Sequence, residues 1–180
     1  GATIGNGQPT LHVLLCAVTS LLLLARSAGR WWDDLLAACL FILALVKPSV
    51  AVCFFWIVLF RPGRKRPALL IIAGYLALTI MAASFQESSL VELMRAWIAN
   101  ATKDLASTAV NYSHSNLQTW AIALGLERWW PAASLLVWSS LGIWVFRNRH
   151  IDIWLLIGVT AMVARFYTYH GWYDDFLVVL

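Results

Sequence analysis

Long apolar runs separated by short basic turns are the feature that most constrains how this chain can fold. Of the 180 residues, 61% are hydrophobic and only 12% are charged. A soluble domain of ordinary composition carries about twice that share of charged residues. The sequence therefore predicts an all-α, polytopic integral membrane protein that lies in the lipid bilayer. Its net charge of +4 comes largely from turns that orient spans in a membrane, and does not indicate a nucleic-acid partner.

The apolar runs define the expected membrane spans. Two of them have only 12 residues each, far fewer than the ~20 that a span needs, so they are either one kinked span or the two legs of a hairpin. A more polar segment with a helical apolar stripe predicts an external amphipathic region at 85–128. The chain lacks an initiator methionine and stops inside an apolar run, so we expect a fragment with spans missing at both ends. The expected spans are 10–26, the hairpin 35–46 and 49–60, 68–84, 131–146, 151–166 and the start of another at 176–180.

Lys47 and Pro48 divide the two short runs. Proline ends or kinks a helix and pushes the residue before it out of the helical region. A hairpin at this point places eight of the 13 basic residues on one side of the membrane, in the three shortest turns. Because positive residues favour the cytoplasmic side, the hairpin is preferred over a single kinked span. The three basic turns contain Arg26 with Arg30, residues 61–66, and Arg147 with Arg149.

This topology gathers the remaining polar segments on the external face. They are the segment with Gln8, the tip at Lys47, the region with Asn116 and the turn 167–175. A buried lysine costs about 2.5 kcal/mol or more at the centre of a bilayer, so it usually serves a site or reaches an interface. We interpret Lys47 as binding a phosphate or another anion. The alternative is an interfacial anchor whose ammonium group extends to water.

The turn after the last complete span carries further candidate groups. His170 and Asp174 are four residues apart, and Asp174 with Asp175 precedes an apolar run. These side chains could bind a polar substrate, a divalent metal or a proton in transfer. The aspartates could equally cap the next helix. Nearby Arg165 either pairs with one of these aspartates or binds phosphate, and the ion pair is the favoured interpretation.

Amide side chains are the last set of candidates. Gln8 and Asn116 could hydrogen-bond sugar hydroxyls, although such residues also cap helices and form turns, and that second interpretation is favoured.

Several short motifs, taken in order, resemble a known family. Gly7-Gln8 before a span, Leu45-Val46-Lys47-Pro48 after one, and the basic turn 61–66 are similar to the membrane glycosyltransferases of family 87. Those are GT-C enzymes related to the bacterial alpha-mannosyltransferases. The stretch 115–126 resembles the family's Asn-Gln-Ser-Leu stretch and short helix in altered form. The turn 169–175 resembles a polar turn in which many members carry a tryptophan followed by histidines, whereas this chain has aspartates.

The resemblance implies a hexosyltransferase of the bacterial plasma membrane with its active site facing outside. Such an enzyme passes a hexose or pentose from a polyprenyl-phosphate sugar to a hydroxyl of a lipid or glycan acceptor. The family's catalytic aspartate lies upstream of the position matching Gly1. Lys47 and His170 would then hold the donor phosphate or line the site, with Asp174 and Asp175 in the same cavity. A transporter or flippase, with these groups along its path, is the alternative from another class, and a polytopic protein without catalysis is a third.

Overall fold

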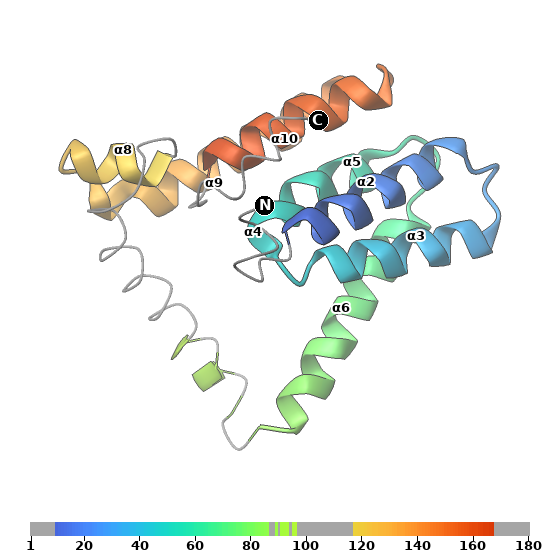
Figure 1. Cartoon of the computed structure of the whole chain (residues 1–180), viewed down its shortest axis with the longest axis horizontal. Helices are drawn as coiled ribbons and strands as arrows, with labels where there is room; N and C mark the ends of the chain where they lie inside the picture. Colours follow the sequence, from blue (N-terminus) through green and yellow to red (C-terminus); the bar gives the residue numbers. More distant parts are fainter. Residues whose placement is uncertain (1–9, 87–88, 90, 94, 97–116, 168–180) are drawn as a thin grey trace.

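The computed structural model describes residues 10–86, 89, 91–93, 95, 96 and 117–167, and over these residues the chain is all-α without strands. The predicted all-α class is therefore confirmed for this part of the chain. Figure 1 shows the helices and the order in which they follow one another. Their bounds are α2 Thr10–Arg26, α3 Trp31–Ala44, α4 Pro48–Ala51, η1 Val52–Phe54, α5 Phe55–Phe60, α6 Arg66–Ser84, α8 Leu117–Ala123, η2 Glu127–Trp129, α9 Trp130–Arg147 and α10 Ile153–Tyr167.

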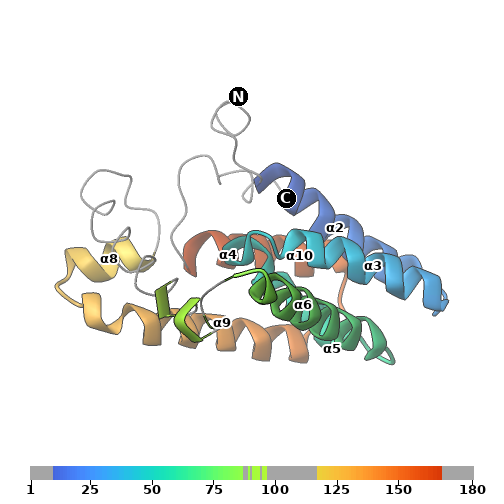
Figure 2. The same ribbon diagram turned by 90° about the horizontal axis from the view of Figure 1, so that it is seen from below.

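Helices α2 and α3 form the most extensive helix pair among the described residues. Small side chains at their interface, including Ala17, Ala37 and Ala38, are buried and let the two backbones come close together. The hydroxyl of Ser20 in α2 donates a hydrogen bond of 2.7 Å to the main-chain oxygen of Ala37 in α3. Figure 2 shows the two helices side by side along one edge of the molecule.

The chain reverses direction at Lys47 and Pro48. Helix α3 ends at Ala44, Lys47 has a non-helical backbone conformation with φ −118° and ψ 81°, and Pro48 opens α4 at a position that tolerates its missing N–H. The returning leg is not a continuous α-helix, because the 3-10 turn η1 separates α4 from α5. At the end of this leg, Arg61 contacts the last turn of α2, so the leg runs back along the full length of that helix.

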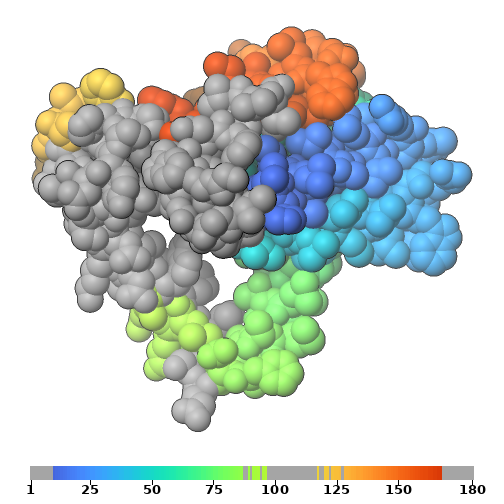
Figure 3. Space-filling view, in the orientation of Figure 1, coloured from blue at the N-terminus to red at the C-terminus, as the bar shows by residue number. Residues whose placement is uncertain are grey.

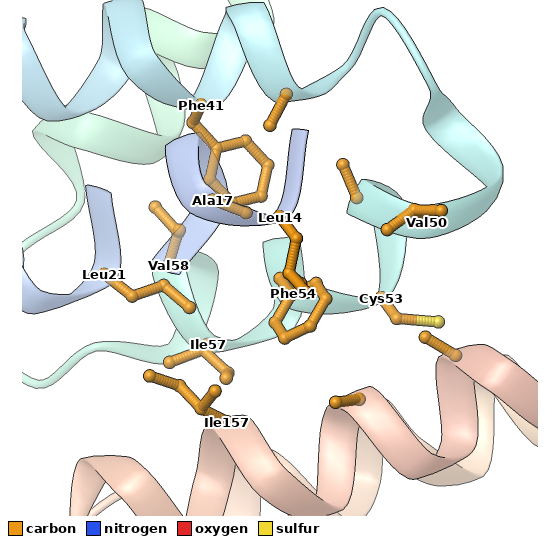
Figure 4. Packing of buried hydrophobic residues seen from close by; sticks show 14 of the residues in the cluster. Leu14, Ala17, Leu21, Phe41, Val50, Cys53, Phe54, Ile57, Val58 and Ile157 are labelled. Carbon is orange, nitrogen blue, oxygen red and sulfur yellow. The ribbon is translucent and has the colours of Figure 1, made fainter. Parts of the chain in front are cut away.

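The core lies where α2, α3, the returning leg and α10 meet. Figure 4 shows Leu21, Phe41, Phe54 and Ile157 from these elements packed together. Phe41 and Phe54 have no exposed surface. Helix α10 thus covers the hairpin from the side away from α3.

Helices α9 and α10 run antiparallel beside the hairpin. The hydroxyl of Ser134, near the start of α9, donates to the main-chain oxygen of Tyr167 at the end of α10, at 2.9 Å. At the other end of α9, the ring of Phe146 meets that of Phe60 with centroids 5.2 Å apart. Together these contacts fix which ends of the helices lie together.

Helix α6 differs from the others because it leaves the assembly. Its first turns pack on α3, where the side chain of Ile42 lies against Gly74. Farther along it extends away from the other described helices, as Figures 1 and 3 show. Among the described residues, α6 is the one helix long and apolar enough to cross a membrane, with a mean hydropathy of 1.9. Three apolar helices are shorter: Thr10–Arg26, the leg Pro48–Phe60 and Ile153–Tyr167.

Candidate functional site

Lys47 lies at the tip of the hairpin with its ammonium group against the start of α2. Its Nζ atom donates a hydrogen bond of 2.7 Å to Oγ1 of Thr10, the first residue of that helix. Lys47 is half-buried and Thr10 is completely buried. The turn that Pro48 imposes brings the lysine to this position, 37 residues from its partner. A positive charge is therefore held in one place at the end of the bundle.

The end of α10 lies close to the same tip. Helix α10 packs against both η1 and α4, the first elements of the returning leg after the tip. Arg165, in the last turn of α10, is largely buried, with 8% of its surface exposed. The structure thus places the described start of α2, the hairpin tip and the end of α10 at one end of the molecule.

Most of the other predicted site residues lie outside the described residues. These are Gln8, Asn116, His170, Asp174 and Asp175. The described residues next to them are Thr10, Leu117 and Tyr167. Thr10 and Tyr167 both lie at the tip end, and α8, which begins at Leu117, packs against α9 and α10. The predicted pairing of Arg165 with an aspartate, and the shared pocket itself, stay predictions.

The opposite end of the molecule holds the basic turns, and it carries contacts that the sequence did not suggest. Arg61 and Arg64 reach back to the end of α2. Nη2 of Arg61 donates to the main-chain oxygen of Ala25 at 3.2 Å, and Nη1 of Arg64 donates to that of Leu24 at 3.3 Å. Burial, with a smaller contribution from Arg64, lowers the pKa of Arg61. These bonds satisfy carbonyl groups that a helix end leaves without partners.

Two neighbouring aspartates at the start of α3 also lie at this end of the molecule. Asp34 is buried, and its carboxylate lies 3.8 Å from Nη1 of Arg64 and 3.5 Å from Nη1 of Arg66. Asp33 instead accepts hydrogen bonds from Ser27 at 2.7 Å and Arg30 at 3.1 Å, and these bonds lower the pKa of its carboxyl group. Acidic residues in a first helical turn are the sequence signal that could have indicated these structural roles.

The third basic turn lies at the same end as the other two. Phe60 and Phe146 are in ring contact, and they directly precede Arg61 and Arg147 in the chain. The three turns that the sequence predicted to share one side therefore lie together, and the Lys47 tip lies at the other end. Within the part of the chain that the structure describes, no three His, Cys, Asp or Glu side chains gather as a metal site.

Comparison of the chain with models of protein families, with curated proteins and with solved structures gave no match.

Proposed function

We propose that this chain forms a membrane-embedded part of a GT-C-like glycosyltransferase that uses a polyprenyl-phosphate sugar as donor. Lys47 is the residue proposed to hold the donor phosphate. The observation that carries the proposal is the position of its ammonium group, fixed against Thr10 at the end of the bundle opposite the three basic turns. The nature of the donor and acceptor follows from the resemblance described above.

An apolar outer surface supports the membrane part of the proposal. Large hydrophobic side chains are exposed on several helices, far beyond the scattered ones that soluble monomers carry. On α6 the exposed fraction reaches 63% at Leu69 and 64% at Ile80. Lipid chains would cover such a surface without any protein partner. Examples from the other helices are Leu15, Leu36, Leu43, Leu136, Ile143, Leu155 and Met162.

The distribution of charge supports an orientation. With the basic turns on the cytoplasmic side, the Lys47 tip faces outside. There a lysine that is half-buried beside a buried hydroxyl has less competition from water for an anionic ligand than an exposed lysine has. Two of the polar segments predicted to line the site, the one before Thr10 and the one after Tyr167, adjoin described residues at this same end.

The proposed chemistry is displacement at the anomeric carbon of the donor sugar. A carboxylate base takes the proton of the acceptor hydroxyl, the acceptor oxygen bonds to the anomeric carbon, and the bond from that carbon to the phosphate oxygen breaks. Polyprenyl phosphate leaves with the bonding electron pair. Negative charge grows on the phosphate during this step, and a fixed ammonium group would stabilise it. In the family that the chain resembles, this base is an aspartate of the first external loop.

The test is the Lys47→Ala variant, assayed in membranes with radiolabelled polyprenyl-phosphate sugars. Removing one fixed charge-stabilising donor is expected to lower transfer by about 10²-fold or more. Lys65→Ala is the matched control, because Lys65 is an exposed lysine of the opposite end, where its Nζ donates to the main-chain oxygen of Leu59. Membrane insertion of both variants should be normal.

Two outcomes would contradict the proposal. Unchanged transfer by Lys47→Ala would remove this residue from the donor site. Movement of the labelled lipid across the membrane without sugar transfer by the wild-type protein would instead favour the transporter or flippase.

A further inference from the structure

An apolar groove lies between α5 and α9, away from the Lys47 tip. It has a volume of about 370 Å³ and is lined by Trp56, Phe60, Ser139, Gly142, Ile143 and Phe146. This volume falls within the ~300–1,000 Å³ of typical small-ligand sites. The lining is aliphatic and aromatic apart from one serine hydroxyl. The groove is therefore suited to a hydrocarbon chain.

Aromatic contacts hold the shape of the groove. The rings of Trp56 and Phe60 are stacked, with an interplanar angle of 1° and centroids 5.4 Å apart. Nε1 of Trp56 donates to the main-chain oxygen of Trp138 at 3.0 Å, which ties α5 to α9. Gly142 lies directly under this indole, since a Cβ atom there would be 2.8 Å from Cε2 of Trp56. The shape of the groove therefore comes from the packing of α5 on α9. It does not depend on a side chain that is free to change its rotamer.

Positive side chains adjoin one end of the groove. Phe60 and Phe146 are followed in the chain by Arg61 and Arg147. The guanidinium carbon of Arg149 lies 4.5 Å from the ring centroid of Phe146, and Arg147 is exposed. A ligand chain in the groove would therefore bring a headgroup at its end within reach of these arginines.

We propose that this groove binds an anionic glycerophospholipid of the bilayer. One acyl chain lies against Trp56, Gly142 and Ile143, and the headgroup phosphate lies at Arg147 and Arg149. Basic pockets between membrane helices on the cytoplasmic side are the sites that bind anionic headgroups. The inference rests on the membrane placement proposed above, but not on sugar transfer, because the donor site at Lys47 is at the other end of the molecule.

The experiment measures lipid retention by the protein purified from membranes. Native mass spectrometry is used with added phosphatidylglycerol or phosphatidylcholine of the same chain length. Wild-type protein should retain phosphatidylglycerol preferentially. Each basic residue near a headgroup contributes about fivefold, so Arg147→Gln with Arg149→Gln should reduce that preference by about 25-fold. Ser139→Trp, which fills the groove from its exposed side, should reduce retention of both lipids.

The matched control removes the same charge elsewhere at this end. Arg26→Gln with Arg30→Gln alters the turn between α2 and α3, on the far side of the hairpin from α9, and should leave the preference unchanged. Equal retention of the two lipids by wild-type protein, or an equal loss in the two double variants, would overturn the proposal. Release of the protein from membranes by alkaline carbonate would refute the membrane placement as well, whereas a failed sugar-transfer assay would leave the lipid site intact.

Discussion

The buried carboxylate of Asp34 allows a quantitative prediction, because a matched neighbour is available. Its side chain is 4% exposed and lies near two guanidinium groups, those of Arg64 and Arg66. Removing one partner of a buried ion pair typically costs 3–5 kcal/mol. The lower end applies here, since Arg66 is 58% exposed and can be rehydrated, and since the 3.8 Å contact with Arg64 exceeds hydrogen-bond length. We therefore expect Asp34→Ala to lower the free energy of unfolding by about 3 kcal/mol.

The control is Asp33→Ala in the same helical turn. Asp33 pairs with Arg30, whose side chain is 77% exposed, and such surface pairs contribute little. Both variants would be unfolded by denaturant in detergent micelles, with helix content followed by circular dichroism. A loss of about 3 kcal/mol corresponds to roughly a hundredfold change in the folding equilibrium. Equal losses in the two variants, or no measurable loss in Asp34→Ala, would refute the reasoning from burial.

Two further predictions use other parts of the fold. Gly142→Ala should cost about 1–3 kcal/mol through its clash with Trp56, while Gly158→Ala in α10, where a Cβ atom meets nothing within 4 Å, should be neutral or stabilising by up to about 1 kcal/mol in the same assay. In a background without Cys16, Cys39 and Cys53, an impermeant thiol reagent should label Val46→Cys from outside intact cells and Ala28→Cys only after permeabilisation. Labelling of both positions from the same side would contradict the proposed orientation.

The reversal of the chain at Lys47 and Pro48 was predictable because its sequence signals are local. A proline and a lone charge between two apolar runs identify a helix end without knowledge of the rest of the fold. The position of the three basic turns at one end of the molecule could also be predicted, from where they fall between the apolar runs. Helix α3 begins at Trp31, before the apolar run 35–46, because its first turn includes the charged Asp33 and Asp34, which hydropathy does not select.

The partners of the charged groups could not be predicted. Nothing near Lys47 in the sequence indicates Thr10, and nothing near Asp34 indicates Arg64, because each pair forms only when helices pack. The groove between α5 and α9 depends in the same way on Gly142 meeting Trp56. Of the residues predicted to bind the donor, Lys47 lies within the described part of the chain, and its donor role stays a prediction.

The positive charge of Arg64 and the hydrogen-bonding geometry of its guanidinium group have separate consequences. Through Nη1 and Nη2 it donates to both Leu24 and Ser27, and it also lies near Asp34. A lysine would keep the charge that the insertion machinery senses but could not span the same acceptors, because its donors share one nitrogen atom. Orientation during biogenesis therefore tolerates either basic residue at this position, whereas the closed junction between the end of α2 and the start of α6 requires the guanidinium group.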